Sequence, residues 1–221
     1  MPALGDFDPR YFAAILVTFI IAITVHEFMH AWTAWMLGDD TARHLGRISL
    51  NPAMHFDPMG ALMFLLIALG LPGIAWGKPV PVNDFRLRPA GRFGRQGSMA
   101  LVSFAGPLSN VVLGAIAAGI LRFSSFTGSS RLELDQFLWI FMLVNFSLAA
   151  FNMVPLPPLD GSRILSALLP AFWRPVLAPL EKYGIPILIL LLLFGRGLGS
   201  SILGGITDPV RELLMKVFAG V

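Results

Sequence analysis

The sequence has no cysteine and few charged residues. Of its 221 residues, 13 % are charged and 56 % are hydrophobic, whereas about a quarter of an average soluble domain is charged. Without cysteine there are no disulfide bonds, thiolate metal ligands or cysteine nucleophiles, so any metal ion must be bound by histidine, aspartate or glutamate. The low charge and a mean hydropathy of +0.74 argue against a soluble domain. They predict an all-α polytopic membrane protein.

Five apolar stretches are candidates for membrane-embedded helices. Four are long, although the last is interrupted, and one is short: 60–75 ends in Gly70-Leu-Pro-Gly73. At about 1.5 Å per residue that stretch covers roughly 24 Å, less than the ~30 Å hydrocarbon core. It is therefore either a short span or a re-entrant segment. The five stretches are residues 11–37, 60–75, 98–121, 136–154 and 184–206.

The connecting segments suggest some non-helical structure within one domain over residues 1–221. Residues 45–51 and 80–83 alternate in the manner of short membrane-associated strands. Six prolines between 155 and 179 predict a loop with one short helix near 163–169. Residues 208–218 resemble a capped amphipathic helix at the membrane interface, beginning with Asp208 as its cap.

The net charge of +3 comes mainly from residues 78–95, where five basic side chains accompany one aspartate. In a membrane protein such a segment marks a cytoplasmic loop beside anionic lipid. We therefore expect contact with the lipid bilayer and no nucleic-acid partner. We also expect a multi-pass protein of a prokaryotic cell (inner) membrane.

The first apolar stretch contains the sequence His26-Glu27-Phe28-Met29-His30. Two histidines four residues apart project from the same helix face and can bind one zinc ion. Glu27 can take a proton from a water activated by that ion and pass it to a leaving amine. Ionisable groups inside a membrane span are costly and usually functional, so a coincidental grouping of core residues is the weaker interpretation.

Two histidines are one short of the three protein ligands usual for catalytic zinc. The best candidate for the third is Asp160, which follows the proline-rich turn 155–158 and precedes Gly161. Broken backbone at membrane depth is tolerated where it lines a cavity. The alternative is that Asp160 only caps the helix that starts near Ser162.

Three motifs in this order resemble the site-2 protease family of intramembrane zinc metalloproteases. They are HEFMH at 26–30, FAGPLSN at 104–110 and NMVPLPPLDG at 152–161. The segments RHLGRISLNPAMHFDPMG and WGKPVPVN are similar to the compact branch without PDZ or CBS domains. The resemblance implies His26, His30 and Asp160 as ligands of one Zn²⁺ ion and Glu27 as the base. It also implies that Asn152, and with it Asn110, supports the substrate or the transition state.

From the residues alone, Asn110 could equally be an interhelical hydrogen-bonding group, and for Asn145 we prefer that structural role. The expected function is a zinc endopeptidase that cuts transmembrane segments of other membrane proteins. The alternative is a metal-binding membrane protein without proteolysis, such as a transporter or an inactive adaptor. For the histidines and Asp160 to meet, residues 60–75 must enter and leave on the same side. The active site then lies toward the cytoplasm.

Overall fold

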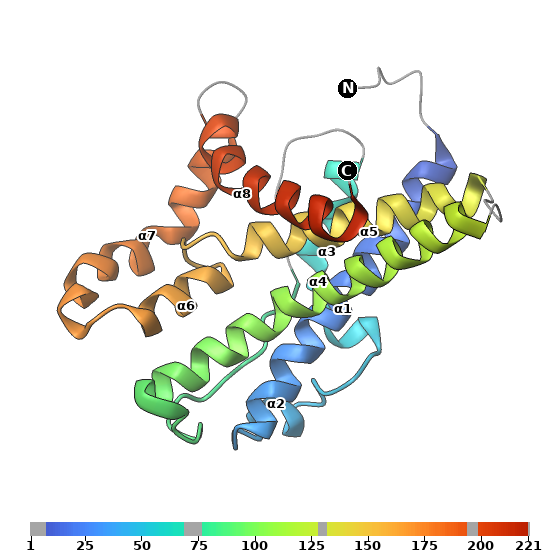
Figure 1. The fold of residues 1–221 in the computed structure, drawn as a ribbon. Coiled ribbons are helices and arrows are strands. Elements are labelled where there is room, and N and C mark those ends of the chain that lie inside the picture. The colour runs from blue at the N-terminus through green and yellow to red at the C-terminus, as the bar shows by residue number, and fades with distance from the viewer. Residues whose placement is uncertain (1–7, 69–76, 128–131, 194–198, 221) are drawn as a thin grey trace.

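The computed structural model describes residues 8–68, 77–127, 132–193 and 199–220, and these residues are mainly helical (Figure 1). Seven longer helices are joined by a short helix α2 (Thr41–His44) and by 3₁₀ turns at Pro52–Met54, Gly91–Phe93 and Ala171–Trp173. A π-helical turn, Met215–Ala219, ends the described chain. The longer helices are α1 (Pro9–Met36), α3 (Pro58–Ala68), α4 (Gly94–Thr127), α5 (Leu132–Asn152), α6 (Asp160–Leu168), α7 (Arg174–Leu193) and α8 (Gly199–Leu214).

Helices α1, α4 and α5 form the centre of the molecule. Each is long and apolar enough to cross a membrane, which confirms the helices predicted at 11–37, 98–121 and 136–154. The Asp8 carboxylate accepts a bond from the Arg10 amide and so caps α1, whose first residue is Pro9. Helix α4 packs against both α1 and α5, and it runs in the opposite direction to each of them (Figure 1).

Helix α3 covers the first part of the predicted segment 60–75, whose remainder lies outside the described residues. It packs on the first half of α1, where Phe64 stacks on Phe19 with ring centroids 4.0 Å apart. The chain on either side of this segment is held together. Phe56 and Gly77 form an isolated antiparallel bridge, and the Lys78 amide donates to the His55 carbonyl at 2.7 Å. Residues 55–56, before this segment, and 77–78, after it, therefore lie side by side.

The strands predicted at 45–51 and 80–83 do not form, and no strand occurs in the part of the chain that the structure describes. The alternation of Ile48, Val80 and Val82 has another cause, because these side chains pack together on Ala31 and Ala42. One-sided packing on helices gives the same alternation as a strand. Neither Pro79 nor Pro81 can donate a backbone bond to a ladder.

The C-terminal helices start earlier than predicted. Helix α7 begins at Arg174 and continues through Pro179 and Pro186, since each proline removes only one helical hydrogen bond. The predicted segment 184–206 is divided between α7 and α8. Asp208 lies inside α8 and pairs with Arg211 at 3.0 Å, so it is not the predicted cap. The predicted short helix near 163–169 is confirmed as α6.

Candidate metal centre

Three side chains from two distant parts of the chain converge inside the bundle. His26 and His30 lie one turn apart on α1 with their Nε2 atoms 3.0 Å from each other. The Oδ2 atom of Asp160, at the start of α6, is 3.2 Å from each of these nitrogens. The sequence-predicted ligand set is therefore brought together, and no other such group occurs in the described residues.

The triangle of ligand atoms fits a zinc ion. Zinc binds histidine nitrogen and carboxylate oxygen at about 2.0–2.2 Å in tetrahedral geometry, which places neighbouring ligand atoms roughly 3.3 Å apart. The three separations here are 3.0, 3.2 and 3.2 Å. Two imidazoles and one carboxylate are also a donor set that catalytic zinc uses, with a fourth position left for water or substrate.

Each histidine is oriented by a hydrogen bond at its other ring nitrogen. Nδ1–H of His26 donates to Oδ1 of Asn110 at 2.6 Å, and Nδ1–H of His30 donates to the Val102 carbonyl at 2.7 Å. Both acceptors lie on α4. These bonds fix the tautomer that presents Nε2 to a metal ion and raise the basicity of the ligand. The backbone acceptor at Val102 carries no side-chain signal that the sequence could reveal.

Asn110 lies behind His26 and holds it from α4. It is fully buried, and its amide donates to the Ala22 carbonyl at 3.2 Å and to Oδ1 of Asn145 at 3.0 Å. Asn145 in turn donates to the Phe141 carbonyl at 2.8 Å. The two amides therefore join α1, α4 and α5, which is the structural role preferred for Asn145.

At Gly106, α4 passes so close to the histidines that there is no room for a side chain. A Cβ atom built at this position would lie 2.4 Å from Nε2 of His30 and 2.7 Å from Cε1 of His26. Any side chain would therefore displace a ligand. Gly161 has a similar function on the other side of the site, since its Cβ would meet the Met153 carbonyl oxygen at 2.2 Å. The glycines of FAGPLSN and LDG thus allow α4 and α6 to close around the ligands.

Asp160 is the first residue of α6, and Leu159 occupies the cap position. Its carboxylate faces the two histidines. The geometry therefore favours the ligand role over the capping alternative.

Glu27 and Asn152 line a cavity of about 540 Å³ that also contains the three ligand residues. The Glu27 side chain is 8 % exposed, and its Oε1 atom lies beside Gly77, only 3.2 Å from where a Cβ would be. Asn152 uses one amide hydrogen on the Leu148 carbonyl at 3.0 Å. One wall is the segment of Gly77, Pro79, Val80 and Val82, and another is the α7 face of Ile185, Leu188 and Ile189.

A buried polar layer lies behind Glu27. Arg47 is 3 % exposed and donates to the Lys78 carbonyl, so it holds the segment that forms the cavity wall. His55 is fully buried in a turn and donates from Nε2 to the Ser49 carbonyl at 2.6 Å. Burial lowers the pKa of the His55 imidazole below its usual value and keeps it neutral. His55 therefore has a structural role in the turn and is not part of the group of possible metal ligands.

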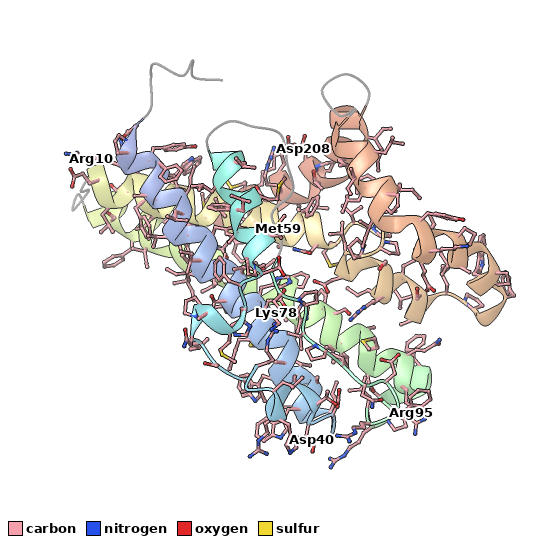
Figure 2. All side chains as sticks on the ribbon, turned by 180° about the vertical axis from the view of Figure 1, so that it is seen from behind. Arg10, Asp40, Met59, Lys78, Arg95 and Asp208 are labelled. Carbon is pink, nitrogen blue, oxygen red and sulfur yellow. The ribbon has the colours of Figure 1, made fainter. Side chains whose placement is uncertain are left out.

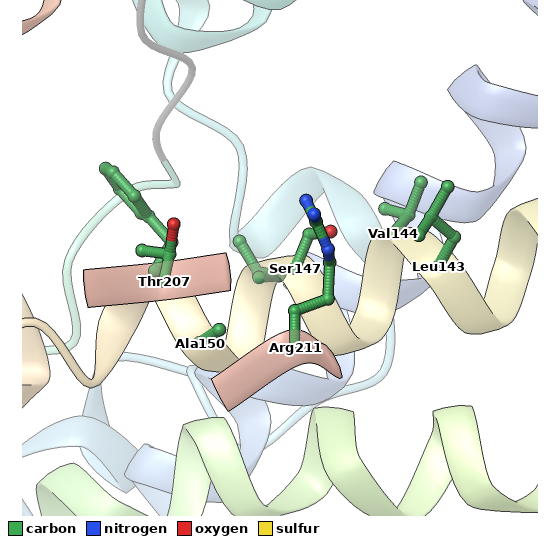
Figure 3. A pocket seen from close by; sticks show the side chains of 8 residues that line it. Leu143, Val144, Ser147, Ala150, Thr207 and Arg211 are labelled. Carbon is green, nitrogen blue, oxygen red and sulfur yellow. The ribbon is translucent and has the colours of Figure 1, made fainter. Parts of the chain in front are cut away.

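A second hollow of about 440 Å³ lies between α5 and α8 (Figure 3). It is lined mostly by apolar side chains of α5, with Thr207 and Arg211 from α8. Arg211 is already paired with Asp208, and none of the lining residues is histidine, aspartate or glutamate. This hollow therefore offers no candidate metal ligand.

Comparison with known proteins gives consistent relatives. A family model described as Peptidase family M50 matches residues 118–195, which include Asp160. YwhC of Bacillus subtilis is 37 % identical over 214 residues, which is 94 % of this chain and 91 % of that protein. Rip2 of Mycolicibacterium smegmatis is 29 % identical over 182 residues, covering 82 % of this chain and 67 % of Rip2. Rip2 of Mycobacterium tuberculosis H37Rv is 29 % identical over 190 residues with the same coverage.

The names of these relatives describe them as candidate zinc metalloproteases. No solved structure matches the chain. The similarity to YwhC extends over almost the whole length of both proteins, and three helices are long and apolar enough for a membrane protein. The chain is a membrane-embedded zinc metalloprotease that belongs to Peptidase family M50, the site-2 protease family.

Proposed function

We propose that this protein is an intramembrane endopeptidase that hydrolyses peptide bonds in or near transmembrane segments of other membrane proteins. The observation that carries the proposal is the position of Glu27. This buried carboxylate follows the first zinc ligand on α1 and opens into the cavity that contains all three ligands. A general base beside a metal ion is the machinery of peptide hydrolysis.

The roles of the side chains follow from their positions. His26, His30 and Asp160 would hold one zinc ion per chain, which supplies a Lewis acid and lowers the pKa of water. Glu27 takes the proton from the attacking water and gives it to the leaving amine nitrogen. Asn152 lines the cavity and has a second amide hydrogen besides the one donated to the Leu148 carbonyl, and we assign to it the support of the substrate carbonyl. Asn110 holds His26 in its orientation.

The substrate must be locally unwound, because helical hydrogen bonds shield its peptide groups. The cavity provides a suitable surface for an extended segment. The non-helical segment 77–82 and apolar side chains of α7 both line the cavity. We propose that an unwound transmembrane segment lies between them with its scissile carbonyl at the zinc site.

We further propose that the active site faces the cytoplasm in the cell membrane of a prokaryote. Asp40 and Arg95 lie at one end of the molecule and Arg10 at the other (Figure 2). Arg95 belongs to the basic segment 78–95, so this end of the molecule is cytoplasmic by the positive-inside rule. The bridge between Phe56 and Gly77 supports a re-entrant segment 60–75. Helix α1 then runs inward.

The alternative is a metal-binding protein without proteolysis. A transporter needs ligands along a path, and its intramembrane carboxylates mark that path. Among the described residues that line the cavity, the carboxylates are Glu27 and Asp160, both at the metal centre. That clustering favours hydrolysis.

The test compares the wild type with Glu27→Gln, each reconstituted in liposomes or co-expressed with candidate single-span proteins. We expect the variant to bind zinc normally and to lose cleavage by at least about a hundredfold, since general-base catalysis contributes 10²–10⁴. Normal proteolysis by Glu27→Gln would refute the role of Glu27. Zinc binding with no cleavage of any membrane substrate by the wild type would favour the alternative.

A further inference from the structure

Arg163 is the only cationic side chain of lysine or arginine among the described residues that line the active-site cavity. The carboxylates in the same lining are Glu27 and Asp160, and both belong to the catalytic centre. Their two negative charges balance the two positive charges of a bound Zn²⁺ ion. The charge of Arg163 is then left without a counterpart in the cavity.

No carboxylate in the described part of the chain forms an ion pair with Arg163, whose side chain is exposed. The Arg163 guanidinium makes a weak polar contact, since its Nη1 atom lies 3.8 Å from the Met99 sulfur. Two arginines near this end are engaged differently. Arg86 pairs with Asp40, and Arg47 is buried against the Lys78 carbonyl. Arg163 is therefore free to bind an anionic group that enters the cavity.

The position of Arg163 relative to the zinc ligands can be estimated along α4. Gly106 faces the histidines, since a Cβ built there would lie 2.4 Å from Nε2 of His30, and Met99 lies seven residues earlier on the same helix, about 10 Å along its axis at 1.5 Å per residue. An extended peptide covers about 3.3 Å per residue. The Arg163 guanidinium thus lies roughly three residues from the scissile bond, toward the end of the molecule that contains Arg95.

We propose that Arg163 forms a subsite for an acidic side chain of the substrate, about three residues from the scissile bond on its cytoplasmic side. The inference rests on the proposed function. It names a substrate class, namely single-span proteins with aspartate or glutamate where the unwound segment approaches the cytoplasmic surface. A guanidinium suits this role because it binds carboxylates through two parallel hydrogen bonds and stays charged.

The experiment uses the full chain with zinc in liposomes of zwitterionic lipid. The probe is a single-span polyleucine-alanine peptide with a central Gly-Ser break. A single Asp, Asn or Lys is placed in turn at each of five positions on both sides of the break. For the wild type we expect kcat/KM to be highest with Asp at one position, by about fivefold over Asn there. Arg163→Gln should remove this preference, and Arg163→Glu should transfer it to Lys.

Arg95→Glu is the matched control, since it makes the same charge change at the same end of the molecule. Arg95 is exposed and does not line the cavity, so its variant should keep the preference for Asp. Affinity for the labelled peptides is measured in the Glu27→Gln background as a readout that does not depend on turnover. This affinity should also be highest for the Asp peptide with Arg163 present and for the Lys peptide in Arg163→Glu.

Four results would overturn the proposal. One is an unchanged preference for Asp in Arg163→Gln. Another is an equal effect of Arg95→Glu. The third is an effect of Arg163 that appears only when phosphatidylglycerol is added, which would assign the side chain to a lipid headgroup. Cleavage of all peptides without charge preference would refute the subsite alone. Absence of cleavage by the wild type would refute the proposed function.

Discussion

At the scale of single residues, Gly106 determines how closely α4 approaches the metal centre. Its replacement by alanine places a methyl group 2.4 Å from Nε2 of His30, so a ligand must move. We expect Gly106→Ala to bind zinc at least about tenfold more weakly, measured by competition with a chromogenic chelator. Gly119→Ala is the control on the same helix, because a Cβ there meets nothing within 4 Å. Equal zinc affinity in both variants would contradict this role.

Asn110 and Asn152 were both candidates for substrate support, and their positions separate the two roles. Asn110→Ala removes the acceptor for Nδ1–H of His26 and should weaken zinc affinity by about 10- to 100-fold. Asn152→Ala leaves the metal centre intact and should lower kcat with unchanged zinc affinity. The measurements are chelator competition and peptide cleavage with saturating zinc. If Asn152→Ala lost zinc as readily as Asn110→Ala, the assignment would be wrong.

At the scale of elements, the re-entrant segment fixes the direction of α1. The chain lacks cysteine, so single cysteines can be introduced without background. We expect Asp40→Cys, after α1, to react with a membrane-impermeant maleimide only from the cytoplasmic side. Glu133→Cys, near the start of α5, should react only from outside, and its side chain is 86 % exposed. Labelling of Asp40→Cys from outside would mean that residues 60–75 cross the membrane.

The elements differ in how well the sequence predicts them. Helices α1, α4 and α5 are long apolar runs, and length together with hydropathy is a local property that a sequence displays directly. The alternation of Ile48, Val80 and Val82 is ambiguous, since packing on Ala31 and Ala42 gives the same pattern as a strand. The first part of α7 was missed because it falls in the proline-rich stretch 155–179 that was expected to be a loop, although the helix continues through Pro179 when most of its bonds remain.

At the scale of the whole molecule, the metal ligands could be predicted from the sequence, but the groups that orient these ligands could not. HEFMH places His26 and His30 on one face by helix geometry alone, and Asp160 follows from motif order. The acceptor for His30 is a main-chain carbonyl at Val102, which any residue could provide. The role of Asn110 depends on which helix packs against α1. These contacts are tertiary, so a single sequence gives no direct sign of them.

The metal centre also joins two elements of the fold, α1 and α6. Two ligands lie on α1 and the third on α6, so bound zinc connects elements far apart in the sequence. A ligand that binds only the folded state stabilises it by about 4 kcal/mol when its free concentration is 1,000 times the Kd. We therefore expect chelation to lower the thermal unfolding midpoint in detergent by several degrees. Asp160→Ala should show the lower midpoint with and without chelator. An unchanged wild-type midpoint after measured loss of zinc would show that the ion has no structural role.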